Sequence, residues 1–221
     1  MHACDNHFWA LIPPEADSAR LICLSETGVE LKALLKSKKT YPISAELWRA
    51  FFKTNRKLYI GMPYDNTVYL VKNDSICSAF HVDAGRYAIP QDFYNDPFET
   101  FSRLLQKGYA SVYNFLESRD FIVLQISIIQ EDFEGVLWGI KNKQAKKWFW
   151  SQMQTWPTNQ QISEFTASYI TDDNRLMILV YPHDLKEHLP FMKKTLNVEI
   201  VSTVNEHDNP ILMEIRLNSR L

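Results

Sequence analysis

The sequence has little glycine, few cysteines and no long apolar run. Only six of its 221 residues are glycine, whereas average usage is roughly 7%. A glycine-rich turn that could present backbone N–H groups to a phosphate is missing, because neither GxxxxGK[ST] nor GxGxxG occurs. The GxSxG elbow of serine hydrolases is also missing. We therefore expect no nucleotide cofactor, and we favour a protein that is not an enzyme.

The three cysteines, Cys4, Cys23 and Cys77, are odd in number and widely spaced. This spacing forms neither a disulfide framework nor a CxxC metal or redox motif, and it is typical of idle thiols in a reducing compartment. The apolar run at residues 8–12 is too short for a secretory signal. No stretch approaches the roughly 20 apolar residues of a membrane helix. The sequence predicts a cytoplasmic protein without membrane contact.

What is present is an ordinary globular composition. Hydrophobic residues make up 46% of the chain, and the formal net charge is −2. A chain this apolar and this close to neutral is expected to fold, and it has no bulk attraction for nucleic acid or anionic membranes. The length suits one domain or two small lobes.

Local patterns predict an alternation of strands and helices. Short β-branched and aromatic runs between turn residues predict strands at residues 20–25, 57–62, 67–72, 76–82, 121–130, 161–170, 175–181, 198–204 and 211–217. Capping residues and helical apolar spacing predict helices at residues 27–36, 44–54, 97–118, 142–155 and 183–197.

This order predicts an α+β fold, with mixed or antiparallel sheets and helices packed on one face. The second half runs strand, helix, strand, strand, helix, strand plus one further strand, which resembles a ferredoxin-like βαββαβ domain. We expect an N-terminal α+β lobe at residues 1–118 and a ferredoxin-like lobe at residues 119–221. A single continuous domain is the alternative.

One segment combines basic and aromatic side chains. Lys143, Lys146 and Lys147 run into Trp148-Phe149-Trp150, and Trp138 lies shortly before. On a helix, Trp148 and Phe149 would be core and the lysines a solvated face. Large aromatic residues outside a core stripe are favoured anchors of protein interfaces, whereas aromatics beside lysines also suit RNA. The candidate binding residues are Trp138, Trp150, Lys143, Lys146 and Lys147.

Catalytic and metal-binding patterns are weaker. His81 and Asp83 are two residues apart and would share a strand face, so they could form an acid–base pair, and His183 is a further candidate. A surface histidine beside an aspartate is the commoner outcome. His2, Cys4, Asp5 and His7 could ligate a metal, but mixed ligands at a chain terminus are more often adventitious. We assign no catalytic residue, cofactor or metal site.

The sequence is therefore interpreted as that of a non-catalytic binding protein that acts through a protein–protein surface. Inhibitors, immunity proteins and accessory subunits belong to this class. The alternative is an RNA-binding or metal-independent RNA-processing protein. Neither the partner nor the oligomeric state follows from the sequence.

Overall fold

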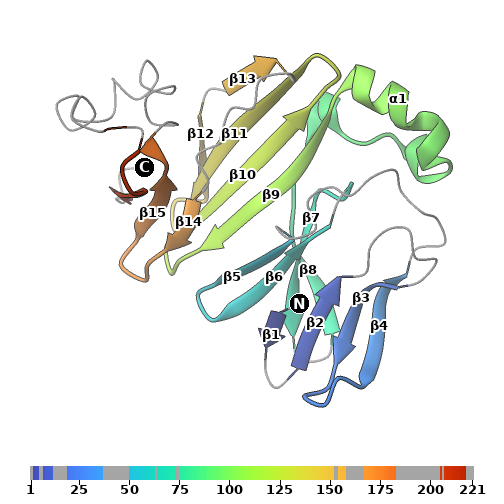
Figure 1. The fold of residues 1–221 in the computed structure, drawn as a ribbon, viewed down its shortest axis with the longest axis horizontal. Helices are drawn as coiled ribbons and strands as arrows, with labels where there is room; N and C mark the ends of the chain where they lie inside the picture. Colours follow the sequence, from blue (N-terminus) through green and yellow to red (C-terminus); the bar gives the residue numbers. More distant parts are fainter. Residues whose placement is uncertain are drawn as a thin grey trace.

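The structure is a computed structural model (Figure 1), and it is built almost wholly from β-strands. Its helices among the described residues are α1 (Pro97–Lys107), η2 (Gly85–Tyr87) and η3 (Gln91–Tyr94). The structure describes residues 2–4, 7–11, 19–36, 50–62, 64–72, 75–151, 154–157, 167–182, 205 and 207–217.

Four antiparallel sheets follow one another along the chain, and neighbouring strands pair in chain order. The first sheet contains β1 (His2–Cys4), β2 (His7–Leu11), β3 (Ala19–Leu24) and β4 (Glu30–Lys36). The second contains β5 (Phe51–Thr54), β6 (Lys57–Gly61), β7 (Thr67–Lys72) and β8 (Ser75–His81). The third contains β9 (Tyr109–Glu117), β10 (Phe121–Ile129), β11 (Phe133–Asn142), β12 (Lys147–Trp150) and β13 (Gln154–Pro157). The fourth contains β14 (Ala167–Ile170), β15 (Arg175–Val180) and β16 (Ile211–Arg216).

The first strands of the last three sheets lie together, because β9 contacts both β5 and β14. Later strands of each sheet extend away from this inner group, and β12 and β13 form the outer edge of the third sheet by pairing with different halves of β11. Figure 1 shows the sheets side by side rather than in one continuous layer. Successive small meanders with adjoining first strands resemble the blades of a β-propeller.

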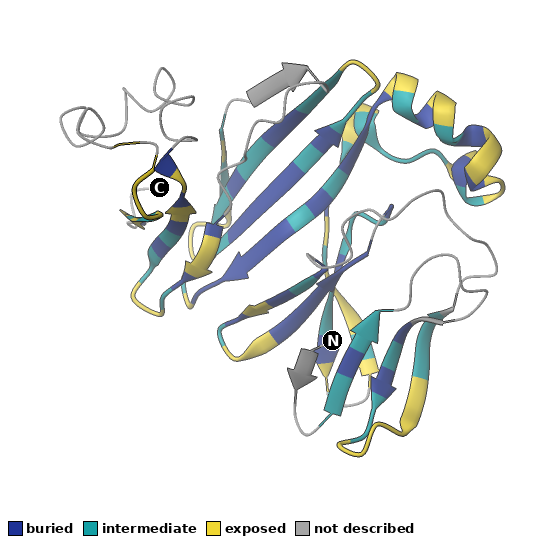
Figure 2. Cartoon of the chain, in the orientation of Figure 1, coloured by how far each residue is buried: buried dark blue, intermediate teal, exposed yellow. Residues whose placement is uncertain are grey.

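The hydrophobic core lies between consecutive sheets. Separate buried clusters fill the three spaces, and their largest members include Trp9 and Leu21, then Phe52 and Phe115, then Phe121 and Leu176. The third sheet therefore has a cluster on each face, and β9 and β10 are buried along most of their length (Figure 2). Two covered faces explain why residues 121–129 read as an almost continuous apolar run.

Seven of the predicted strands are confirmed within one or two residues at each end. They are the strands predicted at residues 20–25, 57–62, 67–72, 76–82, 121–130, 175–181 and 211–217. The end of the strand predicted at 161–170 is found as β14, which forms the predicted hairpin with β15. The predictions at residues 183–197 and 198–204 lie outside the described residues.

The helix predicted at residues 97–118 is correct only in its first half. Asp96 caps α1 by accepting a hydrogen bond from the Glu99 backbone N–H. The helix ends at Gly108, whose φ of 82° lies in the region that favours glycine. The chain continues as β9 (Tyr109–Glu117), whose side chains are buried on both faces of the third sheet. Phe98, on α1, is exposed.

Three other predicted helices are wrong where the structure describes them. Residues 30–36 form β4, residues 51–54 form β5, and residues 147–150 form β12. Each segment carries apolar side chains at spacings that satisfy a helix and a strand alike, and pairing with the neighbouring strand decides between them.

The predicted α+β class and the ferredoxin-like C-terminal half are therefore wrong. In the described residues after 118 no helix packs across a sheet, and the strands there form antiparallel meanders. The expected lobe boundary, between residues 118 and 119, falls in the turn joining β9 to β10, which pair throughout their length. The third sheet is thus shared by the two predicted lobes.

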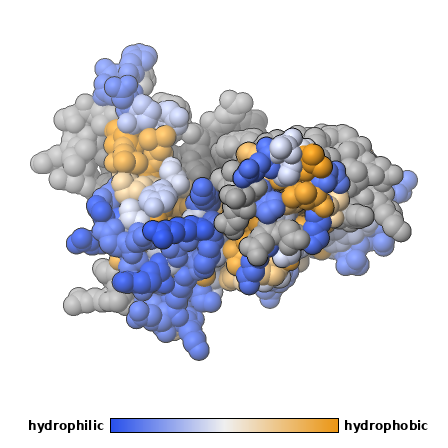
Figure 3. All heavy atoms as spheres, turned by 90° about the horizontal axis from the view of Figure 1, so that it is seen from below, coloured by the Kyte–Doolittle hydropathy of each residue, from blue (hydrophilic) through white to orange (hydrophobic). Residues whose placement is uncertain are grey.

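Two apolar patches lie apart on the surface seen from below, one over the fourth sheet and one over the first (Figure 3). On the fourth sheet the exposed large apolar side chains include Tyr169, Leu179 and Leu212, and on the first they include Val29 and Leu31. In β15, Leu179 alternates with the buried Ile178 and Val180. The outer face of the fourth sheet therefore carries exposed apolar side chains beside the charged Glu214 and Arg216.

Candidate functional site

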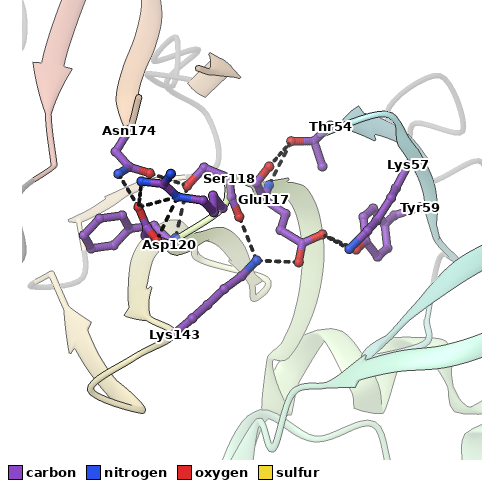
Figure 4. Close-up of polar contacts among 10 residues, drawn as sticks. Thr54, Lys57, Tyr59, Glu117, Ser118, Asp120, Lys143 and Asn174 are labelled. Atoms are coloured by element: carbon purple, nitrogen blue, oxygen red, sulfur yellow. Dashed lines mark hydrogen bonds and ion pairs between the residues drawn. The ribbon is translucent and has the colours of Figure 1, made fainter. Parts of the chain in front are cut away.

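A carboxylate at the end of β9 is the centre of a polar cluster between the second and third sheets (Figure 4). The Glu117 side chain accepts hydrogen bonds from Lys143 Nζ at 2.6 Å and from Lys57 Nζ at 2.9 Å. The Tyr59 hydroxyl donates a short hydrogen bond to the same oxygen as Lys57, Oε2. Residues from β6, β9 and the β11–β12 turn thus meet at one buried carboxylate.

Backbone contacts secure the same place. The Thr54 hydroxyl donates to the Glu117 carbonyl oxygen at 2.7 Å and accepts from the Glu117 N–H at 2.9 Å. Thr54 closes β5 just before a tight turn at Asn55 and Arg56, both with positive φ. The second sheet is therefore joined to the third by the Thr54 side chain, which bonds to the main chain of Glu117.

A second group of contacts joins the third sheet to the fourth. The Ser118 hydroxyl donates to Asn174 Oδ1 at 2.8 Å, and Asn174 Nδ2 donates to Asp120 Oδ2 at 2.8 Å. Lys143 Nζ also donates to the Ser118 carbonyl oxygen at 2.7 Å. Figure 4 shows these groups as a continuation of the Glu117 cluster, so three sheets share one polar network.

The environment keeps Glu117 ionised and Tyr59 protonated. Burial by itself would raise the pKa of Glu117, but hydrogen bonds from Lys143, Tyr59 and Lys57 outweigh burial and lower that pKa. Burial and the hydrogen bond to Glu117 raise the pKa of the Tyr59 hydroxyl. Both Glu117 oxygens are occupied by donors, and a carboxylate with a lowered pKa is a weak base. The cluster is thus suited to holding sheets together rather than to moving protons.

A fully buried amide forms a further connection between the third and fourth sheets. Gln125 Oε1 accepts from Asn114 Nδ2 at 2.7 Å and from the Ala167 N–H at 2.9 Å. Asn114 Nδ2 also donates to the Ala167 carbonyl oxygen at 2.6 Å, and Gln125 Nε2 donates to the Tyr113 hydroxyl at 2.8 Å. These bonds satisfy polar groups that would be costly to bury unpaired.

The predicted binding segment lies on β12, at the outer edge of the third sheet. Trp148 and Trp150 project from the same side of the strand, with ring centroids 5.1 Å apart and ring planes 17° apart. Trp148 also packs against Phe80 of β8, at a centroid distance of 5.4 Å. Trp150 remains 47% exposed. Trp148 is therefore packed between the second and third sheets, whereas Trp150 lies partly in solvent.

Gly139 makes room for the exposed indole. It is paired directly with Trp150 across the β11–β12 ladder. A Cβ atom at position 139 would lie 2.6 Å from Trp150 Cζ3. The indole thus lies against the glycine backbone, a contact that compensates a strand glycine for its missing side chain.

Cations flank the tryptophans. Lys141 Nζ lies 5.7 Å from the Trp148 ring centroid, and Lys147 Nζ lies 4.8 Å from that of Phe149. Lys146 is exposed in the turn before β12. We call Lys141, Lys146, Lys147, Trp148 and Trp150 the tryptophan–lysine surface.

The structure separates the five predicted binding residues. Trp150, Lys146 and Lys147 belong to the tryptophan–lysine surface. Trp138 packs instead against the core between the third and fourth sheets, on the opposite face of β11 from Gly139. Lys143 is held by Glu117.

The proposed acid–base residues are engaged separately. The ring of His81 lies with Nδ1 3.1 Å from the Thr67 hydroxyl, and the Asp83 carboxylate accepts from the Gly85 N–H at 3.0 Å. His183 lies outside the described residues. Among the residues that the structure describes, no three His, Cys, Asp or Glu side chains are grouped to hold a metal ion.

Sequence reasoning missed the Glu117 cluster. Its members come from positions 54 to 174, and the Lys57–Glu117 contact spans 60 residues. The one local signal was a carboxylate directly after the apolar run of β9. A charged residue at that place is ordinary for a strand end, so the signal has no specificity.

Comparisons with known proteins give a family and a structural relative. A family described as "Domain of unknown function (DUF4934)" matches residues 1–216. A crystal structure of a "Putative exported protein" from Bacteroides fragilis is similar, with a TM-score of 0.62 and 16% sequence identity over 92% of this chain. The chain spans 59% of the length of that protein. No curated protein matches the chain.

The Bacteroides fragilis protein is named as an exported protein, whereas the cysteines of this chain led us to predict a cytoplasmic location. Buried thiols such as that of Cys23 are ordinary core residues, so they are a poor indicator of compartment. No helix in the described parts of the chain is both long and apolar enough to span a membrane.

Proposed function

The chain belongs to the DUF4934 family, and from that premise we propose that it is a non-catalytic binding protein that engages another protein through the tryptophan–lysine surface. The observation that carries the proposal is the exposed face of Trp150. A large aromatic side chain that stays half in solvent while its neighbour is anchored in the core has the character of an interface anchor.

The rigidity of the surface supports this role. β12 is paired with β11, Trp148 is wedged against Phe80, and Trp150 rests on Gly139. A binding group that is already fixed loses little conformational entropy when a partner docks. The Glu117 cluster adds to this, because Lys143 at the start of the β11–β12 turn is tied to Glu117 at the end of β9.

We place the site of action outside the cytoplasm. The name of the Bacteroides fragilis relative supports this location. Protease protection in intact cells tests it: an exported protein is degraded only when the compartment outside the cytoplasm is opened or exposed, whereas a cytoplasmic protein survives until the cells are lysed.

One of the three lysines that supported the RNA-binding alternative is engaged within the protein. The Lys143 ammonium donates hydrogen bonds to Glu117 and Ser118. Lys146 and Lys147 remain exposed, but two cations beside an indole suit a protein partner equally. No contact in the structure favours RNA, which is therefore kept as an outcome of the test.

The test is affinity capture from a nuclease-treated extract of the host's own cells. Wild-type protein is expected to retain a stoichiometric protein partner, and Lys147→Glu is expected to lose it. Lys72→Glu, at an exposed position on β7, is the matched control and should behave as wild type. Retention of the partner by Lys147→Glu, or co-purification of RNA in its place, would refute the proposal.

A further inference from the structure

The outer edge of β12 offers backbone groups as well as side chains. Within the described residues β12 pairs only with β11, through Lys147 to Trp150. In an antiparallel ladder, alternate residues bond to one neighbour and direct the remaining N–H and C=O groups to the other side. The far side of β12 therefore has a free row of donors and acceptors in the part of the chain that is described.

Both faces of this edge carry an aromatic group next to a cation. On one face lie Trp148 and Trp150, with Lys141 across the ladder from Trp148. On the other face Lys147 lies over the Phe149 ring. An added strand would place alternate side chains against these two faces, so each would meet apolar and positive surface.

The lysines of this edge differ in their ion pairing from the two lysines of the Glu117 cluster. Among the described residues, Lys141, Lys146 and Lys147 have no acidic side chain within ion-pair distance, whereas Lys57 and Lys143 are both paired with Glu117. A cluster of unpaired like charges next to an indole is complementary to a partner that brings acidic and apolar groups together.

We propose that the tryptophan–lysine surface binds an extended acidic peptide segment that adds as a further strand to the edge of β12. The inference rests on the proposed function and specifies the partner's chemistry. Main-chain hydrogen bonds to β12 would supply affinity, and alternation of acidic and apolar side chains would supply specificity. Glutamate or aspartate would lie on the face of Lys147, and apolar side chains would lie on the opposite face, against Trp150.

A protective role is the competing explanation of the same features. Short edge strands with lysines are a common defence against unwanted strand pairing. An edge that only protects itself binds no peptide, whereas the proposed edge binds one with a defined backbone requirement. The two explanations therefore differ in a direct binding measurement.

The experiment is a fluorescence anisotropy titration of the full chain. The probe is a fluorescein-labelled peptide of about six residues, a common strand length, in which glutamate alternates with valine or phenylalanine. One control peptide has alternate backbone amides N-methylated on the edge that would face β12. A second has lysine in place of glutamate, and a third probe is a single-stranded uridine RNA.

The acidic peptide is expected to bind, with affinity falling about tenfold or more as salt is raised. N-methylation, charge reversal of the peptide, or Lys147→Glu in the protein should each weaken it by about tenfold or more, and Lys72→Glu should not. Absence of binding, or equal binding of the N-methylated peptide, would overturn strand addition. Binding of the RNA alone would overturn the acidic-peptide assignment.

Failure here is distinguishable from failure of the proposed function. If wild type captures a protein partner that Lys147→Glu loses, but no peptide binds, the binding role stands and strand addition to β12 is rejected. If neither a partner nor a peptide binds, the tryptophan–lysine surface is rejected as a binding site.

Discussion

Lys143 Nζ lies 2.6 Å from Glu117 Oε1, across 26 residues of sequence, and this ion pair fixes the turn that leads into β12. The side chain that the sequence offered as a ligand contact is thus part of the framework behind the proposed binding surface. Glu117 is largely buried and Lys143 partly so, and a hydrogen-bonded pair in that setting contributes more than one on the open surface.

Removing the lysine tests this division of roles. Lys143→Ala is expected to lower the free energy of unfolding by about 1–3 kcal/mol, because the carboxylate loses a charge-assisted hydrogen bond. Lys146→Ala, three residues away and exposed, is the matched control and should change stability by less than about 0.5 kcal/mol. Urea unfolding of the three proteins measures both values. Equal effects would contradict the assignment of Lys143 to the framework.

The stability of the chain should depend on the ionisation of Glu117. Its folded-state pKa is lowered by Lys143, Tyr59 and Lys57, so the unfolded state binds its proton more readily. The stabilisation is then present above the unfolded pKa of about 4.3 and is lost as the pH falls through the lowered folded pKa. The stability difference between wild type and Glu117→Gln should shrink as the pH is reduced from 7 to about 3.

Unfolding titrations across that range provide the measurement. Glu26→Gln, at an exposed turn position, serves as the control and should track wild type at every pH. A difference that grows on acidification would mean that Glu117 is protonated in the folded protein at neutral pH, contrary to the hydrogen-bonding pattern.

The buried Gln125 is expected to hold the fourth sheet to the third. Gln125→Leu removes the acceptor of the Ala167 N–H and of Asn114 Nδ2, at a cost of about 2–4 kcal/mol for groups left unpaired. Hydrogen exchange should accelerate first in β14 and β15 and much less in β6 and β7. The exposed Gln144→Leu is the control. Uniform acceleration over all sheets would show that the amide does not act at this junction.

The stacked tryptophans should give an exciton couplet in the circular dichroism spectrum, since their rings are close and nearly parallel. Gly139→Ala places a Cβ against the Trp150 ring, so the indole must move and the couplet should weaken. The cost should be about 1 kcal/mol, because the displaced ring is exposed. In a Trp150→Ala background the same change should cost nothing further. An unaltered couplet would contradict the packing described.

The sequence predicted the strands better than the architecture. Residues 67–72 and 175–181 are runs of strand-favouring residues between clear turn residues, and both form strands in the structure. Trp148 and Phe149 could belong to either a helix or a strand, and only pairing with Lys141 and Ile140 makes them β. Assigning a helical period to residues 142–155 replaced a strand of an antiparallel meander with the helix of a βαβ unit, which gave the wrong fold class.

The exposure of the candidate binding residues could be predicted only in part, for the same reason. Lys146, Lys147 and Trp150 are exposed because a lysine-rich turn and an edge strand face solvent whatever the wider fold. Whether Trp138 and Lys143 are available depends on Glu117 and on the fourth sheet. Those contacts join segments that are far apart in the chain, and no local pattern in one sequence encodes them.

The most direct test of the binding role is site-specific photo-cross-linking in the host's own cells. A photoreactive phenylalanine analogue replaces Trp150 in one protein and Leu31, an exposed residue on β4, in another. The account predicts a discrete protein adduct from position 150 and none from position 31. No adduct from position 150, or the same adducts from both positions, would contradict a partner that docks on the tryptophan–lysine surface.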